Sequence, residues 1–108
     1  MQIDLGGTTA LVTGGSSGIG EAISEALAEC GAKVAIHYNT GEKSAMEMAA
    51  RFGGGCEAFC ADLSDPGAAR DLFASAAGSL GRIDLLVNNA GIFTPAPPEV
   101  GHEDWMKT

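Results

Sequence analysis

A glycine-rich run, Thr13-Gly14-Gly15-Ser16-Ser17-Gly18-Ile19-Gly20, is the stretch of this sequence best suited to chemistry. Its glycines let the backbone turn sharply and approach a bound group closely. The run lies between a predicted strand and a predicted helix, whose first N–H groups and dipole attract phosphate. It therefore predicts a pyrophosphate site, and the alternative is a tight turn without a ligand. A P-loop is excluded, because no Gly-Lys-Ser or Gly-Lys-Thr follows.

The cysteines and histidines predict no further chemistry. Cys30, Cys56 and Cys60 are odd in number and lack the C-x-x-C pairs of zinc sites, so we interpret them as reduced thiols. His37 and His102 are far apart in sequence, which argues against a metal site. Both histidines are interpreted as ordinary side chains.

The composition is that of one globular domain of 108 residues, 45% of them hydrophobic. A net charge of -8 argues against nucleic-acid binding, which needs clustered basic side chains. No apolar stretch approaches the roughly 18 residues of a membrane span, so no membrane contact is expected. The N-terminus resembles neither a secretory signal nor a transit peptide, and we expect a cytoplasmic protein.

The glycine-rich run needs a strand before it and a helix after it, and the sequence supplies both. Residues 8–13 form a short β-branched and apolar run, typical of a strand buried on both faces. Residues 19–29 predict an amphipathic helix that ends before Gly31. Its apolar positions recur three and four apart: Ile19, Ala22, Ile23, Ala26 and Leu27.

The same alternation continues along the chain. Asp65 and Pro66 predict a helix start, with aspartate as the N-cap and proline at the first helical position. Apolar runs and helical periodicity predict strands over 33–38, 56–61 and 83–87, and helices over 45–52 and 66–80.

Strands that alternate with helices in this way imply right-handed βαβ units. The predicted fold class is therefore α/β, with a doubly wound parallel sheet. The prolines of residues 92–98 predict a loop, and residues 99–108, with Trp105, predict the start of another helix.

Three motifs together resemble the short-chain dehydrogenase/reductase family. Gly14, Gly18 and Gly20 follow its G-x-x-x-G-x-G spacing, Asp62-Leu63 follows the third strand, and Asn88-Asn89-Ala90-Gly91 follows the fourth. The resemblance covers essentially the whole chain. It implies that residues 1–108 are the N-terminal part of a single NAD(P)-binding Rossmann-type domain, truncated after the fourth strand and the start of the next helix.

The resemblance also implies which residues contact the cofactor. The glycine-rich run would hold the pyrophosphate and the adjoining ribose, the pair after the third strand would contact adenine, and the segment after the fourth strand would lie along the cofactor's ribose. The predicted cofactor-binding residues are Gly14, Ser16, Ser17, Gly18, Ile19, Gly20, Tyr38, Asn39, Thr40, Asp62, Leu63, Asn88, Ala90 and Gly91.

The segment after the second strand bears on the choice of dinucleotide. NAD sites commonly carry an acidic residue about twenty positions past the glycines, where this chain has Tyr38-Asn39-Thr40. Without a carboxylate there, a 2′-phosphate is not repelled, and Asn39, Thr40 or Lys43 can donate to it. This favours NADP. NAD stays the alternative, because Ser17 and Asn39 stand where NADP-preferring members of the family often carry arginine.

The catalytic serine and Tyr-x-x-x-Lys that the resemblance implies are absent from these residues. The single tyrosine is Tyr38, and Glu42 follows four positions later. We therefore expect part of an oxidoreductase that transfers hydride between NAD(P) and a carbonyl or alcohol, inactive by itself. Residues 34–39 look like the 3-oxoacyl-[acyl-carrier-protein] reductase branch, and Ile92 to Pro98 would form one rim of the substrate pocket.

Two other functions are open to a chain of this kind. One is a non-catalytic dinucleotide-binding or interaction module; the other, a Rossmann-like methyltransferase, is disfavoured by the three motifs. A fourth strand without its neighbours would be an exposed edge, so the isolated chain is expected to be unstable or to form a homo-oligomer.

Overall fold

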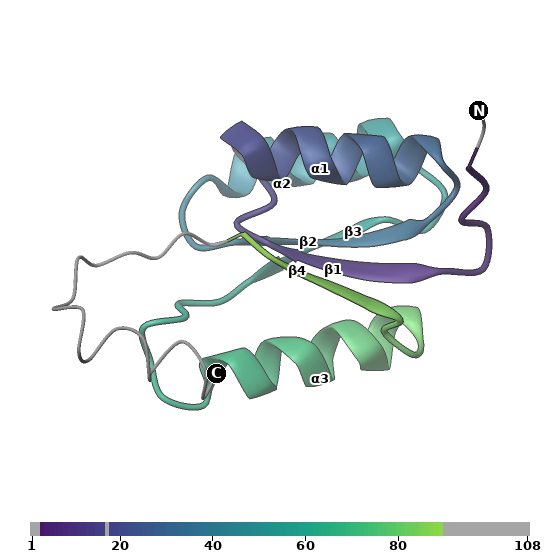
Figure 1. Cartoon of the computed structure of the whole chain (residues 1–108). Coiled ribbons are helices and arrows are strands. Elements are labelled where there is room, and N and C mark those ends of the chain that lie inside the picture. The colour runs from purple at the N-terminus through teal and green to yellow at the C-terminus, as the bar shows by residue number, and fades with distance from the viewer. Residues whose placement is uncertain (1–2, 17, 90–108) are drawn as a thin grey trace, which may run out of the picture.

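The computed structural model describes residues 3–16 and 18–89 as a parallel sheet between two layers of helices (Figure 1). The strand order is β3-β2-β1-β4, and every pairing is parallel. Helices α1 and α2 cover one face and α3 covers the other. The predicted doubly wound, Rossmann-type α/β class is confirmed. The elements are β1 (Thr9–Thr13), α1 (Gly18–Glu29), β2 (Lys33–Tyr38), α2 (Glu42–Phe52), β3 (Glu57–Cys60), α3 (Ala68–Leu80) and β4 (Leu85–Asn88).

Strand β1 lies at the centre of the molecule, and all five of its residues are buried. Successive side chains of a strand point to opposite faces, so Leu11 and Val12 belong to different cores. Val12 packs on the α1 and α2 side with Val34 and Ile36. Leu11 packs on the α3 side with Leu72. A helix layer on each face explains why β1 reads as a continuous apolar run.

Helix α1 buries a different stripe from the one predicted. Gly20 and Ser24 are buried and Ile23 and Leu27 are partly buried, whereas Ile19 is 72% exposed. Ala22 and Ala26 are exposed as well. The predicted apolar face is therefore wrong for these three positions. The physical reason is that small residues bring the helix close to the sheet, so Gly20 and Ser24 lie innermost although they are not apolar.

Three boundaries differ from the prediction by two residues or more. Helix α2 begins at Glu42, three residues before its predicted start. Helix α3 begins at Ala68, because Asp65 and Pro66 form a turn in which the Ala68 N–H donates to the Asp65 carbonyl at 3.1 Å. Gly67, in the left-handed region at φ 87°, is the residue before the helix, so Asp65 is not its N-cap. Strand β4 begins at Leu85, two residues later than predicted, because Asp84 is used in a side-chain contact with β1.

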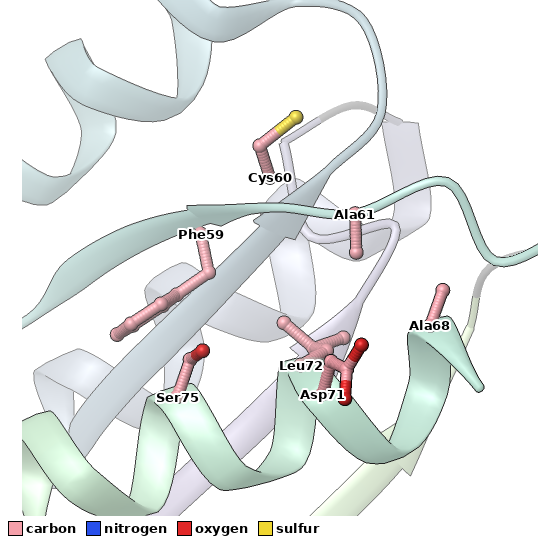
Figure 2. Close-up of a pocket in the computed structure, with 7 residues that line it drawn as sticks. All are labelled: Phe59, Cys60, Ala61, Ala68, Asp71, Leu72 and Ser75. Carbon is pink, nitrogen blue, oxygen red and sulfur yellow. The ribbon is translucent and has the colours of Figure 1, made fainter.

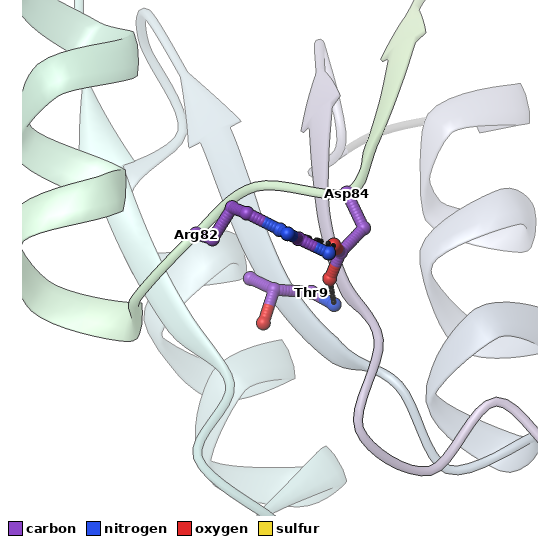
Figure 3. Close-up of polar contacts among 3 residues, drawn as sticks. All are labelled: Thr9, Arg82 and Asp84. Atoms are coloured by element: carbon purple, nitrogen blue, oxygen red, sulfur yellow. Dashed lines mark hydrogen bonds and ion pairs between the residues drawn. The ribbon is translucent and has the colours of Figure 1, made fainter.

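That contact joins the amino ends of β1 and β4 (Figure 3). The Asp84 N–H donates to the Thr9 carbonyl at 2.8 Å, and Asp84 Oδ2 accepts from the Thr9 N–H at 3.1 Å. Arg82 Nε and an Arg82 terminal nitrogen each lie 2.9 Å from Asp84 Oδ1. The hydrogen bond from Thr9, followed by that from Arg82, lowers the pKa of the Asp84 carboxyl below its usual value.

Within the described residues, no helix has the length and apolar character that a membrane span requires. The predictions for Ser17, Ala90 and Gly91, for the loop at 92–98 and for a helix over 99–108 lie outside those residues.

Candidate functional site

The carboxyl ends of β1, β2 and β4 meet at one edge of the sheet, where the glycine-rich run turns from β1 into α1 (Figure 1). Gly14 has φ 62°, a left-handed conformation that favours glycine. A Cβ on Gly20 would overlap the Gly14 carbonyl oxygen. A Cβ on Gly15 would lie 2.9 Å from the Val12 carbonyl oxygen. These glycines let the first turn of α1 pack directly onto the end of β1.

Side chains from three other segments hold this turn. The Gly14 N–H donates to His37 Nδ1 at 2.8 Å, and the Gly14 carbonyl accepts from Asn89 Nδ2 at 3.3 Å. The Gly15 N–H donates to the His37 carbonyl at 2.9 Å, while Ser24 Oγ donates to the Gly15 carbonyl at 3.4 Å. Because both peptide groups are satisfied within the protein, their orientation is fixed before any ligand arrives.

His37 is a residue whose role the sequence reasoning missed. Its side chain is only 3% exposed, and Nε2 lies 2.8 Å from the Ala61 carbonyl oxygen at the end of β3. Since Nδ1 accepts from Gly14, the proton must be on Nε2, which donates to Ala61. The only sequence signal was a polar residue within an otherwise apolar strand. His37 therefore has a structural role in the site that its interpretation as an ordinary side chain did not specify.

Strands β1 and β4 are also tied together at the site. The Asn89 N–H donates to Thr13 Oγ1 at 2.8 Å. Thr13 Oγ1 lies 3.3 Å from the Val87 carbonyl oxygen and 3.2 Å from Asn88 Oδ1, and its hydroxyl can donate to either. Asn88 is exposed at the sheet edge, whereas Asn89 reaches back to the glycine turn. The predicted residue Asn88 and the unpredicted residue Asn89 therefore flank the same turn.

Asp62 and Leu63 follow β3 at the same edge. Asp62 Oδ1 accepts from the Ser64 N–H at 3.0 Å and from Ser64 Oγ at 2.6 Å. The Ser64 hydroxyl, and next the Ser64 N–H, lower the pKa of the Asp62 carboxyl. Leu63 is partly buried against the α3 core. The pair thus presents a fixed carboxylate beside an apolar side chain.

The segment after β2 splits into a buried and an exposed part. The Tyr38 ring is 8% exposed and packs in the core with Ala45 and Met48. Burial, followed by the charge of Glu42, raises the pKa of Tyr38. Asn39 and Thr40 are exposed. A Cβ on Gly41 would lie 3.7 Å from Ser16 Oγ, so this loop runs beside the glycine turn.

A depression of about 250 Å³ lies between β3 and α3 (Figure 2). Phe59 and Ala61 face α3 across it, while Cys60 points to the other side of the strand. None of its lining residues is among the predicted cofactor contacts: Phe59, Cys60, Ala61, Ala68, Asp71, Leu72 and Ser75. It is therefore separate from the glycine turn.

Across the part of the chain that the structure describes, no three His, Cys, Asp or Glu residues gather closely enough to hold a metal ion. Cys30, Cys56 and Cys60 are free thiols.

A parallel sheet with a glycine-rich β1–α1 turn at its carboxyl edge defines the Rossmann-type class of nucleotide-binding folds. A sequence profile of the family described as short chain dehydrogenase matches residues 8–108. The chain belongs to the short-chain dehydrogenase family, as its three motifs predicted.

Relatives with different enzyme names match this chain. The chain is 44% identical over 90 residues to 1-deoxy-11-beta-hydroxypentalenate dehydrogenase of Streptomyces avermitilis, covering 82% of this chain and 33% of that protein. It is 50% identical over 90 residues to the rhamnolipids biosynthesis 3-oxoacyl-[acyl-carrier-protein] reductase of Pseudomonas aeruginosa, covering 81% of this chain and 34% of that protein. The chain thus spans about a third of the length of these relatives.

Solved structures share the fold. A short chain dehydrogenase from Burkholderia cenocepacia in complex with NADP superposes with a TM-score of 0.79 at 44% identity. The alignment covers 88% of this chain and 40% of the other.

Proposed function

We propose that this chain is the NADP-binding part of a short-chain oxidoreductase that interconverts a carbonyl and an alcohol. The observation that carries the proposal is the fixed glycine turn, whose Gly14 and Gly15 peptides are held by His37, Ser24 and Asn89. A Cβ on Gly20 would overlap the Gly14 carbonyl oxygen, so glycine at this position lets the start of α1 lie directly against the turn. Family membership supplies the reaction class.

The donor set of the site fits a dinucleotide. The start of α1 offers N–H groups and a positive dipole end to a pyrophosphate, beside Ser16, Gly18 and Ile19. The exposed Ile19 side chain stands at this first turn and offers an apolar surface to the cofactor. In the proposed complex, Ser17 and Gly20 complete the pyrophosphate segment.

The adenosine half is assigned to the end of β3 and the nicotinamide-side ribose to the end of β4. Asp62 keeps its negative charge because Ser64 stabilises the carboxylate, and an anion accepts well from the amino group of adenine. Leu63 supplies an apolar contact for the ring. Asn88, with Ala90 and Gly91, is assigned to the ribose. When bound, NADPH supplies the hydride.

NADP is proposed over NAD because the loop after β2 carries no carboxylate at its exposed positions 39 and 40. Asn39 and Thr40 are exposed polar donors in the same loop as Gly41, which lies beside Ser16. The buried Tyr38 ring would support this loop from the core. The NADP complex of the Burkholderia cenocepacia relative supports the choice.

Proton transfer to the substrate is proposed to depend on residues of a longer parent protein. These 108 residues contain no Tyr-x-x-x-Lys, and Tyr38 is in the core. The chain alone is expected to bind cofactor without turnover.

Calorimetric titration of the chain with NADPH and NADH tests this function. We expect NADPH to bind more tightly, and Ser16→Asp to weaken binding by at least roughly tenfold, because a carboxylate would repel the pyrophosphate. Ser75→Asp, at an exposed residue of α3 that lines the separate depression, is the matched control and should bind like the wild type. Binding of S-adenosylmethionine that NADPH does not displace would contradict the proposal, as would a folded chain that binds neither dinucleotide.

A further inference from the structure

One imidazole connects two parts of the site that lie far apart in sequence. His37 Nδ1 accepts from the Gly14 N–H at 2.8 Å, and His37 Nε2 donates to the Ala61 carbonyl at 2.8 Å. Gly14 begins the glycine turn, and Ala61 directly precedes Asp62. The ring is almost completely buried, so water does not compete for either hydrogen bond.

The backbone of His37 strengthens the same connection. Its carbonyl accepts from the Gly15 N–H at 2.9 Å. In the β2–β3 register His37 is the partner of Phe59, two residues before Ala61. His37 therefore spans the sheet edge from the turn after β1 to the end of β3, and both ring nitrogens have defined partners.

Only one tautomer satisfies this arrangement. An N–H group on Nδ1 would face the Gly14 N–H, and an unprotonated Nε2 would face a carbonyl oxygen. Two donors or two acceptors in contact would each leave a buried group unpaired. The hydrogen-bond pattern thus requires a neutral ring with its proton on Nε2.

The geometry points to His37 as a positioning residue for the dinucleotide: its Nε2–H imidazole sets the pyrophosphate-binding turn relative to the adenine-binding pair Asp62 and Leu63. This inference rests on the proposed function, since it assigns the two ends of the cofactor to those segments. His37 contacts the protein on both sides and acts through Gly14 and Ala61. A side chain that has only the acceptor for the Gly14 N–H, or only the donor for the Ala61 carbonyl, keeps one of the two hydrogen bonds.

Three substitutions separate the two bonds. In His37→Asn the amide oxygen lies where Nδ1 was and retains an acceptor for Gly14. In His37→Gln the amide nitrogen reaches toward the Nε2 position and retains a donor for Ala61. His37→Leu removes both. Each variant is titrated with NADPH and with adenosine 2′,5′-bisphosphate, which carries the adenine end without the pyrophosphate.

We expect His37→Leu to weaken NADPH binding by roughly tenfold or more, because a buried Gly14 N–H loses its acceptor and the turn reorients. The ratio of the NADPH affinity to the bisphosphate affinity should stay near the wild-type value in His37→Asn. It should fall in His37→Gln, which no longer anchors the turn. A general loss of stability would lower both affinities together, so the affinity ratio would not differ between His37→Asn and His37→Gln.

A second measurement does not depend on ligand binding. Nitrogen NMR shifts of the imidazole report which ring nitrogen carries the proton, and His102→Gln assigns the signals because the chain has two histidines. A proton on Nε2 supports the inference, and a proton on Nδ1 overturns it. If His37→Leu does not fold, the tautomer and the affinity ratios of His37→Asn and His37→Gln still test the inference.

The outcomes also separate this inference from the proposed function. A wild-type chain that binds no dinucleotide contradicts the function, whatever the tautomer. A wild-type chain that binds NADPH, with a folded His37→Leu variant that binds within about twofold, overturns the role of His37 and leaves the function intact.

Discussion

At Gly20 the first turn of α1 meets the end of β1 without space for a side chain. Gly20→Ala would push a methyl group into the Gly14 carbonyl oxygen. We expect the free energy of unfolding to fall by about 1–3 kcal/mol, the usual cost of overpacking, and NADPH binding to be lost because the turn moves. Urea unfolding and calorimetry measure the two effects.

Gly78→Ala is the matched control for this substitution. Gly78 lies in α3, and a Cβ there would meet nothing within 4 Å. Alanine restricts the unfolded chain more than glycine does, so stability should rise by about 0.4–1 kcal/mol. If Gly20→Ala behaves like Gly78→Ala, the close contact does not constrain the turn.

The sequence predicted the positions where the backbone conformation requires glycine. It did not predict which side chains form hydrogen bonds with the glycine turn. Gly14 and Gly20 were predicted because they lie between a strand and a helix and follow the G-x-x-x-G-x-G spacing. The contacts of His37 and of Asn89, which was predicted only as a member of a motif, were not, because their hydrogen bonds depend on which strands become neighbours. The sequence motif alone does not predict that Asn89 donates to the Gly14 carbonyl.

The contact between the amino ends of β1 and β4 depends on the carboxylate of Asp84. Asp84→Asn removes the charge that binds Arg82 and weakens the acceptor for the Thr9 N–H. We expect a lower midpoint of thermal unfolding at pH 7. Asp71→Asn, which removes an exposed carboxylate of α3 without touching β1 or β4, should change the midpoint less.

The pH dependence of this effect follows from the lowered pKa of Asp84 in the folded protein. Such a group contributes stability above its ordinary pKa of 3.8, and that contribution is lost as the pH falls through the lowered folded value. The difference between wild type and Asp84→Asn should therefore shrink below about pH 4. A difference that stays constant down to pH 2 would contradict an electrostatic origin.

Over the described residues, the order and type of the helices and strands could be predicted, since apolar periodicity and glycine stops mark them. Their edges and faces could not. Helix α3 starts late because Gly67 rather than Asp65 precedes it, and α1 presents Ser24 to the sheet because a hydroxyl can bond the Gly15 carbonyl. Such local hydrogen bonds override the apolar pattern.

For the whole molecule, β4 forms one edge of the described sheet and carries exposed leucines. Leu85 is 39% exposed and Leu86 55% exposed. An apolar edge strand invites pairing with a second copy. We expect the chain to self-associate at micromolar concentrations or above, and Leu86→Lys to reduce this association in sedimentation velocity without lowering stability.

Phe73→Lys is the comparison that identifies the edge as the cause. Phe73 is 43% exposed on α3, so the variant removes an apolar side chain of similar exposure from a helix that has no free edge. If both lysine variants dissociate the oligomer equally, general surface hydrophobicity and not the strand edge drives it.

The contrast between the anchored turn and the exposed positions Asn39 and Thr40 has a consequence for evolvability. Gly14 contacts residues from β2, from α1 and from the segment after β4, so a change at any of them requires compensation at the others. Asn39 and Thr40 have exposed side chains, so a substitution at either position requires no compensating change elsewhere. Substitutions that alter the choice between two dinucleotides can therefore accumulate in that loop one at a time, while the turn changes only through concerted replacements.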